Sequence, residues 1–220
     1  MTARPARKRV AVLISGRGSN MTALIEAAKA EDYPAEIALV LSNRSDAGGL
    51  ATAQREGIAT AIVDHRAFGK DREAFERAIQ EQLGAHRIDL VCLAGFMRIL
   101  TPWIIGKWNG RMLNIHPALL PAYKGLHTHE RALADSATEH GATVHFVVPE
   151  MDSGPIVAQG RVPVLPGDDA ATLAARVLAV EHKIYPLALK LLAQGRVRTD
   201  GDRCVVDGPL AADEKALVPQ

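Results

Sequence analysis

The 220-residue sequence has only two cysteines, few aromatic residues (4%) and almost no excess charge, with a formal net charge of +1. Cys92 lies inside an apolar run and no Cys-x-x-Cys pair occurs, so Cys92 and Cys204 are predicted to be free thiols in a reducing compartment, the cytoplasm. No apolar run approaches the ~18 residues of a membrane span. The apolar stretch 10–14 is also too short for a signal-peptide core. These shortages argue against a disulfide scaffold and a membrane protein.

Basic residues are dense only near the N-terminus, at Arg4, Arg7, Lys8 and Arg9. A protein that works on nucleic acid usually carries a basic face or stripe. We therefore expect no nucleic-acid partner, and we interpret the cluster as a solvated tail. The length and the 48% of hydrophobic residues are enough for a full core. One domain over residues 1–220 is expected.

Short apolar runs alternate with amphipathic segments in the first half of the chain, which predicts an α/β fold with a Rossmann-like, mostly parallel twisted sheet and helices on both faces. The predicted strands lack regular polar alternation, as strands buried on both faces do. They are Val10–Ser15, Ile37–Ser42, Thr60–Asp64, Asp89–Gly95 and Arg111–His116. The predicted helices between them are Met21–Ala30, Ala47–Glu56 and Asp71–Leu83.

The pattern changes after residue 140. Two β-like runs, Thr143–Val148 and Ile156–Val164, are joined by a short segment that leaves no room for a helix, which predicts an antiparallel C-terminal extension of the sheet. A long helix is expected over about Asp169–Gln194, capped by Asp168 or Asp169. Residues 196–208 are predicted to form a hairpin, and the tail, about 209–220, is expected to be loose.

Ser15-Gly16-Arg17-Gly18-Ser19-Asn20 lies between the first strand and the first helix. A helix N-terminus offers free backbone N–H groups and the positive end of the dipole to an anion. The third glycine of a dinucleotide loop and the Gly-Lys-Ser/Thr ending of a triphosphate loop are both missing. A single phosphate is the predicted ligand, and a tight turn without a ligand is the alternative.

Asn114 and His116 point to the same side of a predicted strand, and Pro117 should end that strand. Ligands of open α/β sheets bind at such carboxyl ends. An amide and an imidazole there suit acyl transfer, because both can donate to the oxyanion of a tetrahedral intermediate and histidine can also move protons. A structural histidine bonded to a backbone carbonyl is the alternative.

Asp152 lies at the bend between the two late strands, where a turn aspartate is ordinary. If the fold brings this carboxylate to His116, it can stabilise the imidazolium or hold a water that shuttles protons. A cis peptide bond is also predicted at Leu120-Pro121, because the chain must turn sharply after the strand.

The sequence resembles the phosphoribosylglycinamide formyltransferase family, the stand-alone bacterial type of glycinamide ribonucleotide transformylase. The likeness extends from about Val10 to Lys190. It rests on Val-Leu-Ile-Ser-Gly-Arg-Gly-Ser-Asn (12–20), Leu-Ala-Gly-Phe-Met-Arg-Ile-Leu (93–100), Leu-Asn-Ile-His-Pro-Ala-Leu-Leu-Pro (113–121), Gly-Leu-His-Thr-His (125–129), Gly-Ala-Thr-Val-His-Phe (141–146) and Asp-Ser-Gly-Pro (152–155).

The resemblance implies the formyltransferase fold, with a nucleotide-phosphate half at about 9–100 and a folate and catalytic half at about 101–195. It implies formyl transfer from 10-formyltetrahydrofolate, as cosubstrate and without a metal, to glycinamide ribonucleotide in purine (IMP) biosynthesis. The implied catalytic residues are Asn114, His116 and Asp152, and the implied ribonucleotide site comprises Gly18, Ser19, Asn20 and Glu181. The implied folate contacts are Arg72, Met97, Arg98, Ile99, Leu100, Asn114, Val148, Pro149, Glu150, Met151 and Asp152.

Four other interpretations of the function stay open. A formyltetrahydrofolate hydrolase would share the catalytic residues, but such relatives usually carry an extra N-terminal domain. A methionyl-tRNA formyltransferase would need a C-terminal RNA-binding domain, and neither extra domain is expected here. A metal-dependent enzyme would use His127, His129 and Asp152, and a non-catalytic phosphosugar-binding module would need no chemistry at all. The chain is expected to be a monomer or weak homodimer.

Overall fold

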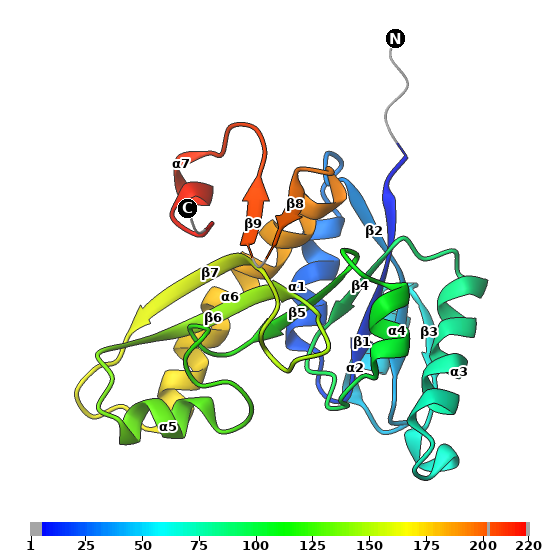
Figure 1. Cartoon of the computed structure of the whole chain (residues 1–220), viewed down its shortest axis with the longest axis horizontal. Helices are drawn as coiled ribbons and strands as arrows, with labels where there is room; N and C mark the ends of the chain where they lie inside the picture. Colours follow the sequence, from blue (N-terminus) through cyan, green and yellow to red (C-terminus); the bar gives the residue numbers. More distant parts are fainter. Residues whose placement is uncertain (1–5, 202, 219–220) are drawn as a thin grey trace.

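The computed structural model describes residues 6–201 and 203–218, which are built around a seven-stranded sheet in the order β3-β2-β1-β4-β5-β6-β7 (Figure 1). The pairings among β1 to β5 are parallel, and β6 pairs antiparallel with both β5 and β7. The strands are β1 (Lys8–Ile14), β2 (Ala35–Ser42), β3 (Ala59–Ile62), β4 (Leu90–Leu93), β5 (Met112–His116), β6 (Glu139–Phe146) and β7 (Ile156–Pro163). The predicted mostly parallel sheet with an antiparallel extension is confirmed.

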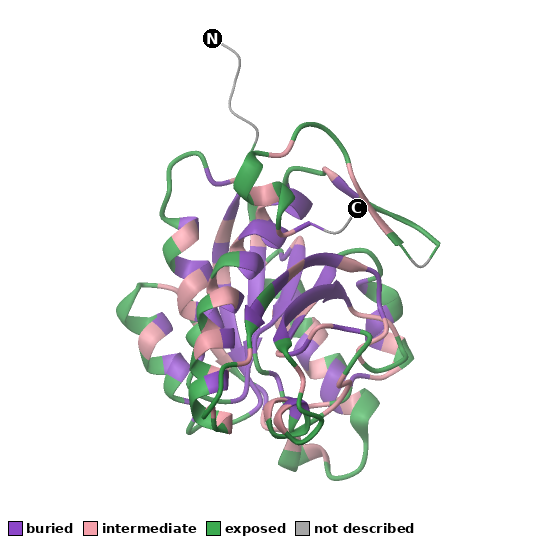
Figure 2. Ribbon diagram, turned by 90° about the vertical axis from the view of Figure 1, so that its left-hand side faces the viewer, coloured by how far each residue is buried: buried purple, intermediate pink, exposed green. Residues whose placement is uncertain are grey.

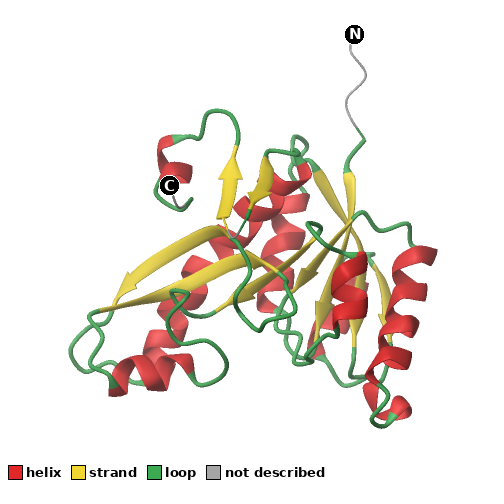
Figure 3. Ribbon diagram, viewed as in Figure 1, coloured by secondary structure: helices red, strands yellow, loops and turns green. Residues whose placement is uncertain are grey.

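Helices cover both faces of this sheet (Figure 3). One face carries α1 (Ser19–Ala28), α2 (Gly48–Arg55), α5 (Thr128–Ala134) and α6 (Ala170–Ala193), and the other carries η1 (His65–Phe68), α3 (Arg72–Ala85) and α4 (Pro102–Lys107). Asp169 caps α6 by accepting from the backbone N–H of Thr172 at 2.8 Å, which confirms one of the two predicted caps.

The core lies on both sides of the sheet because alternate residues of each central strand face opposite helix layers. In β1, Val10, Val12 and Ile14 pack into one cluster, while Ala11 and Leu13 pack into the other, and all five are fully buried. Figure 2 shows the buried strands at the centre and the exposed residues on the outer sides of the helices. Because these strands are buried on both faces, their sequences are nearly continuous apolar runs.

The direction of the strand order reverses at β1, which has β2 on one side and β4 on the other. The loops after β1 and β4 therefore leave the sheet side by side, and the backbone N–H of Ser15 donates to the Gly95 carbonyl at 3.2 Å. Such a topological switch point is where open α/β sheets bind ligands. The predicted phosphate loop lies at this point.

Before the C-terminal tail, three short helices of the described chain were not predicted, namely η1, α4 and α5. They have four, six and seven residues, which is too few turns for helical periodicity to stand out in a sequence. Strand β6 also begins earlier than predicted, at Glu139 rather than Thr143, because its pairing with β7 continues to Pro163. The predicted cis peptide at Leu120-Pro121 is confirmed.

The prediction of a loose tail is wrong for the described part of residues 209–220. This part contains α7 (Ala212–Lys215), and Val218 is buried in the core beside Leu210 and Leu217. The carbonyl of Leu217 accepts from the backbone N–H of Gln159 at 2.8 Å, so the tail covers part of the edge strand β7. Residues 219–220 lie outside the described residues.

The predicted solvated basic tail is also wrong in part. Lys8 and Arg9 open β1, and Arg9 forms an ion pair with Glu36 at 2.5 Å. Arg7 donates to the carbonyl of Ala35 at 3.0 Å. Arg4 lies outside the described residues. The predicted hairpin at 196–208 is confirmed as β8 (Val197–Asp200) and β9 (Arg203–Val206). Among residues 6–201 and 203–218, none of the helices combines the length and the apolar character that a membrane span needs.

A buried carboxylate fixes the start of α4, directly after the loop that follows β4. Glu76 of α3 is fully buried, and it accepts from the backbone N–H of Thr101 at 2.5 Å and from the Thr101 hydroxyl. Thr101 is the N-cap of α4 but makes no side-chain cap bond of its own. Glu76 thus holds the N-cap residue of α4 from another helix, by its backbone N–H and its hydroxyl.

We predict that Glu76→Ala lowers the free energy of unfolding by about 1–3 kcal/mol, because it removes a buried acceptor and leaves the half-buried donors of Thr101 without their partner. Urea denaturation measures this. Glu73→Ala, on the same helix, removes only an exposed pair with Arg77 and should cost less than about 1 kcal/mol. Equal effects of the two substitutions would contradict the capping role of Glu76.

Candidate active site

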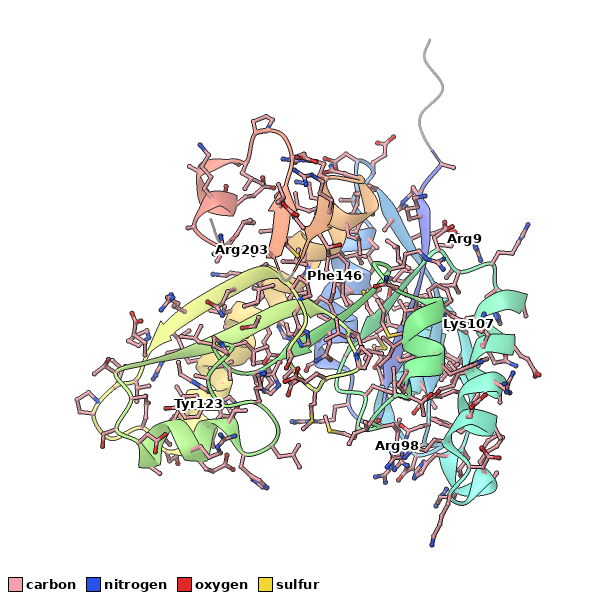
Figure 4. All side chains as sticks on the ribbon, in the orientation of Figure 1. Arg9, Arg98, Lys107, Tyr123, Phe146 and Arg203 are labelled. Atoms are coloured by element: carbon pink, nitrogen blue, oxygen red, sulfur yellow. The ribbon has the colours of Figure 1, made fainter. Side chains whose placement is uncertain are left out.

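A cleft of about 940 Å³ opens at the carboxyl ends of β4 and β5. Residues from 93–100, 114–117, 125–130 and 145–152 line it, together with Ile105 of α4. Ten of the eleven predicted folate contacts are among its lining residues: Met97, Arg98, Ile99, Leu100, Asn114, Val148, Pro149, Glu150, Met151 and Asp152. Arg72 is not; it is exposed at the first position of α3. In Figure 4, Arg98 lies at the lower edge of the molecule, on the loop after β4.

The predicted phosphate loop ends at the N-terminus of α1. Gly18 is the N-cap residue with φ 75°, a left-handed conformation that favours glycine, and no side chain caps the helix. The first backbone N–H groups of α1 are therefore left to bind an anion. The loop is joined to the neighbouring one because the backbone N–H of Met97 donates to the Ser15 hydroxyl at 2.8 Å.

Asn20 and Glu181 are brought together although 161 positions separate them. The Asn20 side-chain amide donates to the Glu181 carboxylate at 2.5 Å, and both residues are buried. Burial raises the pKa of Glu181, while the bond from Asn20 opposes that shift. Two of the four predicted ribonucleotide residues thus form one polar pair between α1 and α6.

The predicted catalytic residues Asn114 and His116 lie at the end of β5, with one residue between them. His116 is buried, and its Nε2 lies 2.9 Å from the carbonyl oxygen of Tyr123. Because a carbonyl oxygen only accepts, Nε2 carries the hydrogen of that bond. The other nitrogen, Nδ1, faces Asp152 Oδ2 at 3.5 Å, which is longer than a direct hydrogen bond.

Asp152 reaches this position from the bend between β6 and β7. Its Oδ2 accepts from the backbone N–H of Gly125 at 2.9 Å, and its side chain is only 10% exposed. Asp152 has φ 51°, which is uncommon for a residue with a Cβ. The 36-residue separation in sequence is therefore closed by two loops that meet above His116.

His145 is a member of this site for which the sequence suggested no role. Its Nδ1 lies 2.9 Å from the Phe146 carbonyl and so donates to it, and burial lowers the pKa of the ring. In the neutral ring Nε2 is the acceptor, and the Asn114 amide nitrogen lies 3.2 Å from it. His145 thus orients the Asn114 amide, and its Nε2 also lies 3.7 Å from Asp152 Oδ1.

The position of His145 follows from the antiparallel register, in which Asn114 pairs with His145 and His116 with Thr143. Thr143 is fully buried; its hydroxyl donates to the Ala118 carbonyl at 2.7 Å and accepts from the Leu120 N–H at 3.1 Å. Because side chains alternate along a strand, Thr143 and His145 of β6 face the same side of the sheet. The sequence does not determine which residues of β5 they pair with.

The sequence and the fold are similar to those of known proteins. A model of the formyl transferase family matches residues 8–189. Phosphoribosylglycinamide formyltransferase of Escherichia coli is 45% identical over 199 residues, which cover 90% of this chain and 93% of that protein. The crystal structure of glycinamide ribonucleotide transformylase 1 from Symbiobacterium toebii is 42% identical with a TM-score of 0.90, over 94% of this chain and 97% of that chain.

The match to a trifunctional relative is local. The trifunctional purine biosynthetic protein adenosine-3 of Bos taurus is 50% identical over 194 residues, so 88% of this chain spans only 19% of that protein. The fold and the family model agree, and the chain belongs to the formyl transferase family.

A third buried histidine, His140, lies beneath the loop that contacts His116. Its ring meets the Tyr123 ring at 5.7 Å and the His129 ring at 5.2 Å, both edge to face, and only 1% of the residue is exposed. Figure 4 labels Tyr123 on this loop. Burial, and then the nearby His129, lowers the pKa of His140 to about 4.

This shift predicts that stability falls in acid. The unfolded chain binds a proton at His140 near pH 6.5, whereas the folded chain does so only near pH 4, so the free energy of unfolding falls as the pH drops between these values. In His140→Phe, the slope of the free energy of unfolding against pH should decrease between pH 4 and 6.5 by up to about 1.4 kcal/mol per pH unit. Urea denaturation at several pH values measures the slope. An unchanged slope would show that His140 is not held neutral.

Proposed function

We propose that the chain transfers the formyl group of 10-formyltetrahydrofolate to the amine of N1-(5-phosphoribosyl)glycinamide, a step of de novo purine biosynthesis. The observation that carries this function is the placement of Asp152 3.5 Å from His116, with Asn114 beside them in a cleft of about 940 Å³. The likeness to the Escherichia coli phosphoribosylglycinamide formyltransferase, over 93% of that protein, supports the substrate assignment.

The reaction needs an oxyanion donor and a route for protons. The amine nitrogen attacks the formyl carbon, and the carbonyl oxygen becomes an oxyanion in the tetrahedral intermediate. The Asn114 amide has two N–H groups, of which His145 engages one, so the other can donate to the oxyanion. Collapse breaks the bond to N10 of the folate, which must gain a proton, while the attacking nitrogen must lose one.

His116 and Asp152 are the proposed route for these protons. The contact of His116 Nε2 with Tyr123 is 2.9 Å, whereas that of Nδ1 with Asp152 is 3.5 Å. The longer contact is easier to exchange for a substrate group or a bridging water. We therefore assign proton transfer to Nδ1, which donates to the oxyanion when the ring is an imidazolium, with Asp152 as the nearest carboxylate.

The two substrates approach from neighbouring loops. The phosphate of the ribonucleotide is proposed to bind the N-terminus of α1 at Gly18, Ser19 and Asn20, and its ribose or glycinamide part to bind Glu181. The folate is proposed to fill the cleft beside residues 97–100 and 148–152, with Arg72 and Arg98 near its carboxylates. The exposed side chains of Met97, Ile99 and Met151 at the cleft support an apolar partner.

The proposed mechanism uses no metal ion. In the part of the chain that the structure describes, no three His, Cys, Asp or Glu side chains gather closely enough to hold one. We further propose that the protein is cytoplasmic, since Cys92 and Cys204 are free thiols, and that it acts as a monomer or weak homodimer without a nucleic-acid or membrane partner.

We predict that His116→Ala and Asp152→Asn each slow turnover at least ~100-fold, as expected for the loss of an acid–base group. Turnover is measured by the absorbance change of the folate product, and circular dichroism checks the fold. His86→Ala, beyond the far end of α3, and Asp207→Asn, in an exposed pair after β9, are matched controls that should keep normal rates. Near-normal turnover of both site variants would contradict the proposed proton-transfer roles of His116 and Asp152.

The alternative function is hydrolysis of the folate to release formate. A formyltetrahydrofolate deformylase from Pseudomonas syringae shares the fold, with a TM-score of 0.85 at 25% identity over 66% of that chain. We expect the protein to consume 10-formyltetrahydrofolate only when glycinamide ribonucleotide is present. Release of formate at a similar rate without the ribonucleotide would establish the hydrolase instead.

A further inference from the structure

Neighbouring residues of one loop bind neighbouring residues of another at the active site. In the loop between β5 and α5, the Gly125 N–H donates to Asp152 Oδ2 at 2.9 Å, and the Lys124 ammonium donates to the Ser153 hydroxyl at 2.5 Å. Asp152 and Ser153 lie together in the loop between β6 and β7. The aspartate is thus held by its own contact and by a second contact one residue away.

The Ser153 hydroxyl also closes the turn that contains Asp152. Its Oγ donates to the Met151 carbonyl at 3.0 Å, so the bond spans the aspartate in between. Asp152 has a left-handed backbone with φ 51°, which is unfavourable for a side chain with a Cβ unless its surroundings hold it. Ser153 stabilises this turn because one hydroxyl both donates to Met151 and accepts from Lys124.

Lys124 is an anchored donor rather than a freely solvated surface lysine. Its carbonyl accepts from the Arg131 guanidinium of α5 at 2.7 Å, and Arg131 also lies over the Tyr123 ring at 5.5 Å. The Lys124 side chain is 38% exposed, and its ammonium faces a Glu150 carboxylate oxygen at 3.6 Å as well as Ser153. Helix α5 therefore fixes the main chain from which Lys124 reaches across to the second loop.

We propose that Lys124 and Ser153 are positioning residues that hold the Asp152 carboxylate against His116. Neither residue touches the reacting atoms in this arrangement, and the inference rests on the proposed catalytic role of Asp152. Without the Lys124–Ser153 bond, the contacts of the described residues that still tie the two loops there are the Gly125 hydrogen bond and, where Lys124 is kept, its longer contact with Glu150. The loops then separate more often, and Asp152 spends less time within reach of His116.

This role predicts a loss in kcat rather than in ribonucleotide binding. The proposed ribonucleotide residues Asn20 and Glu181 lie on α1 and α6, outside both loops. We expect Ser153→Ala and Lys124→Met each to lower kcat about 10-fold, since small misplacements of a reacting group are costly. The KM for glycinamide ribonucleotide should stay within about 2-fold of the wild-type value.

Steady-state kinetics of the full chain, with both substrates varied, test the proposal. Because the pair acts as one unit, the double variant should be no slower than the slower single variant, within about 2-fold. Ser153→Thr keeps a hydroxyl and should restore most of the rate. Matched controls are Ser136→Ala, an exposed serine that also has a left-handed backbone, and Lys8→Met, at the amino end of β1. Thermal unfolding of every variant identifies any loss caused by failure to fold.

Two results would overturn the proposal. One is turnover of the folded Ser153→Ala and Lys124→Met variants equal to that of the controls. The other is a loss of kcat in the double variant that equals the product of the two single losses, because the two residues would then act independently. Asp152→Asn is assayed in parallel: if it loses turnover while the pair variants do not, only the positioning role fails. Near-normal turnover of Asp152→Asn would remove the catalytic assignment and the positioning role with it.

Discussion

The Asp152 carboxylate is the group on which the arrangement of the site depends. It takes a hydrogen bond from the Gly125 backbone, faces His116 at 3.5 Å and faces His145 at 3.7 Å. These three partners come from the β5–α5 loop, from β5 and from β6. A single buried carboxylate therefore joins the two loops that line one side of the cleft, and it does so over the strand pair that carries the amide and the imidazole.

The antiparallel pairing of β5 with β6 makes this possible. In that register Asn114 pairs with His145 and His116 with Thr143, so each residue at the end of β5 gains a buried polar neighbour. His145 orients the Asn114 amide, and Thr143 holds the turn that follows His116. The parallel half of the sheet contributes the predicted phosphate loop at its switch point. The proposed phosphate site thus lies on the parallel half, whereas the proposed folate site takes residues from both halves, 97–100 after β4 and 148–152 after β6.

Much of the fold and of the site could be predicted from the sequence, because the sequence features that predict them are local. The apolar runs around Val12 and Val91 identified strands buried on both faces, and Pro117 identified the end of the strand with Asn114 and His116. His145 was not assigned because its role depends on strand register, which alternation alone does not determine. The short helices α4 and α5 and the packed tail around Val218 were missed because each is held by tertiary contacts rather than by its own periodicity.

The central claim is that Asp152 stays beside His116 when both substrates are bound. A crystal structure with glycinamide ribonucleotide and an unreactive analogue of 10-formyltetrahydrofolate tests it most directly. We predict that the carboxylate lies within about 4 Å of the imidazole, and that the Asn114 amide lies about 3 Å from the oxygen that stands for the formyl carbonyl. A carboxylate turned to solvent, with both loops ordered around the ligands, would contradict the account.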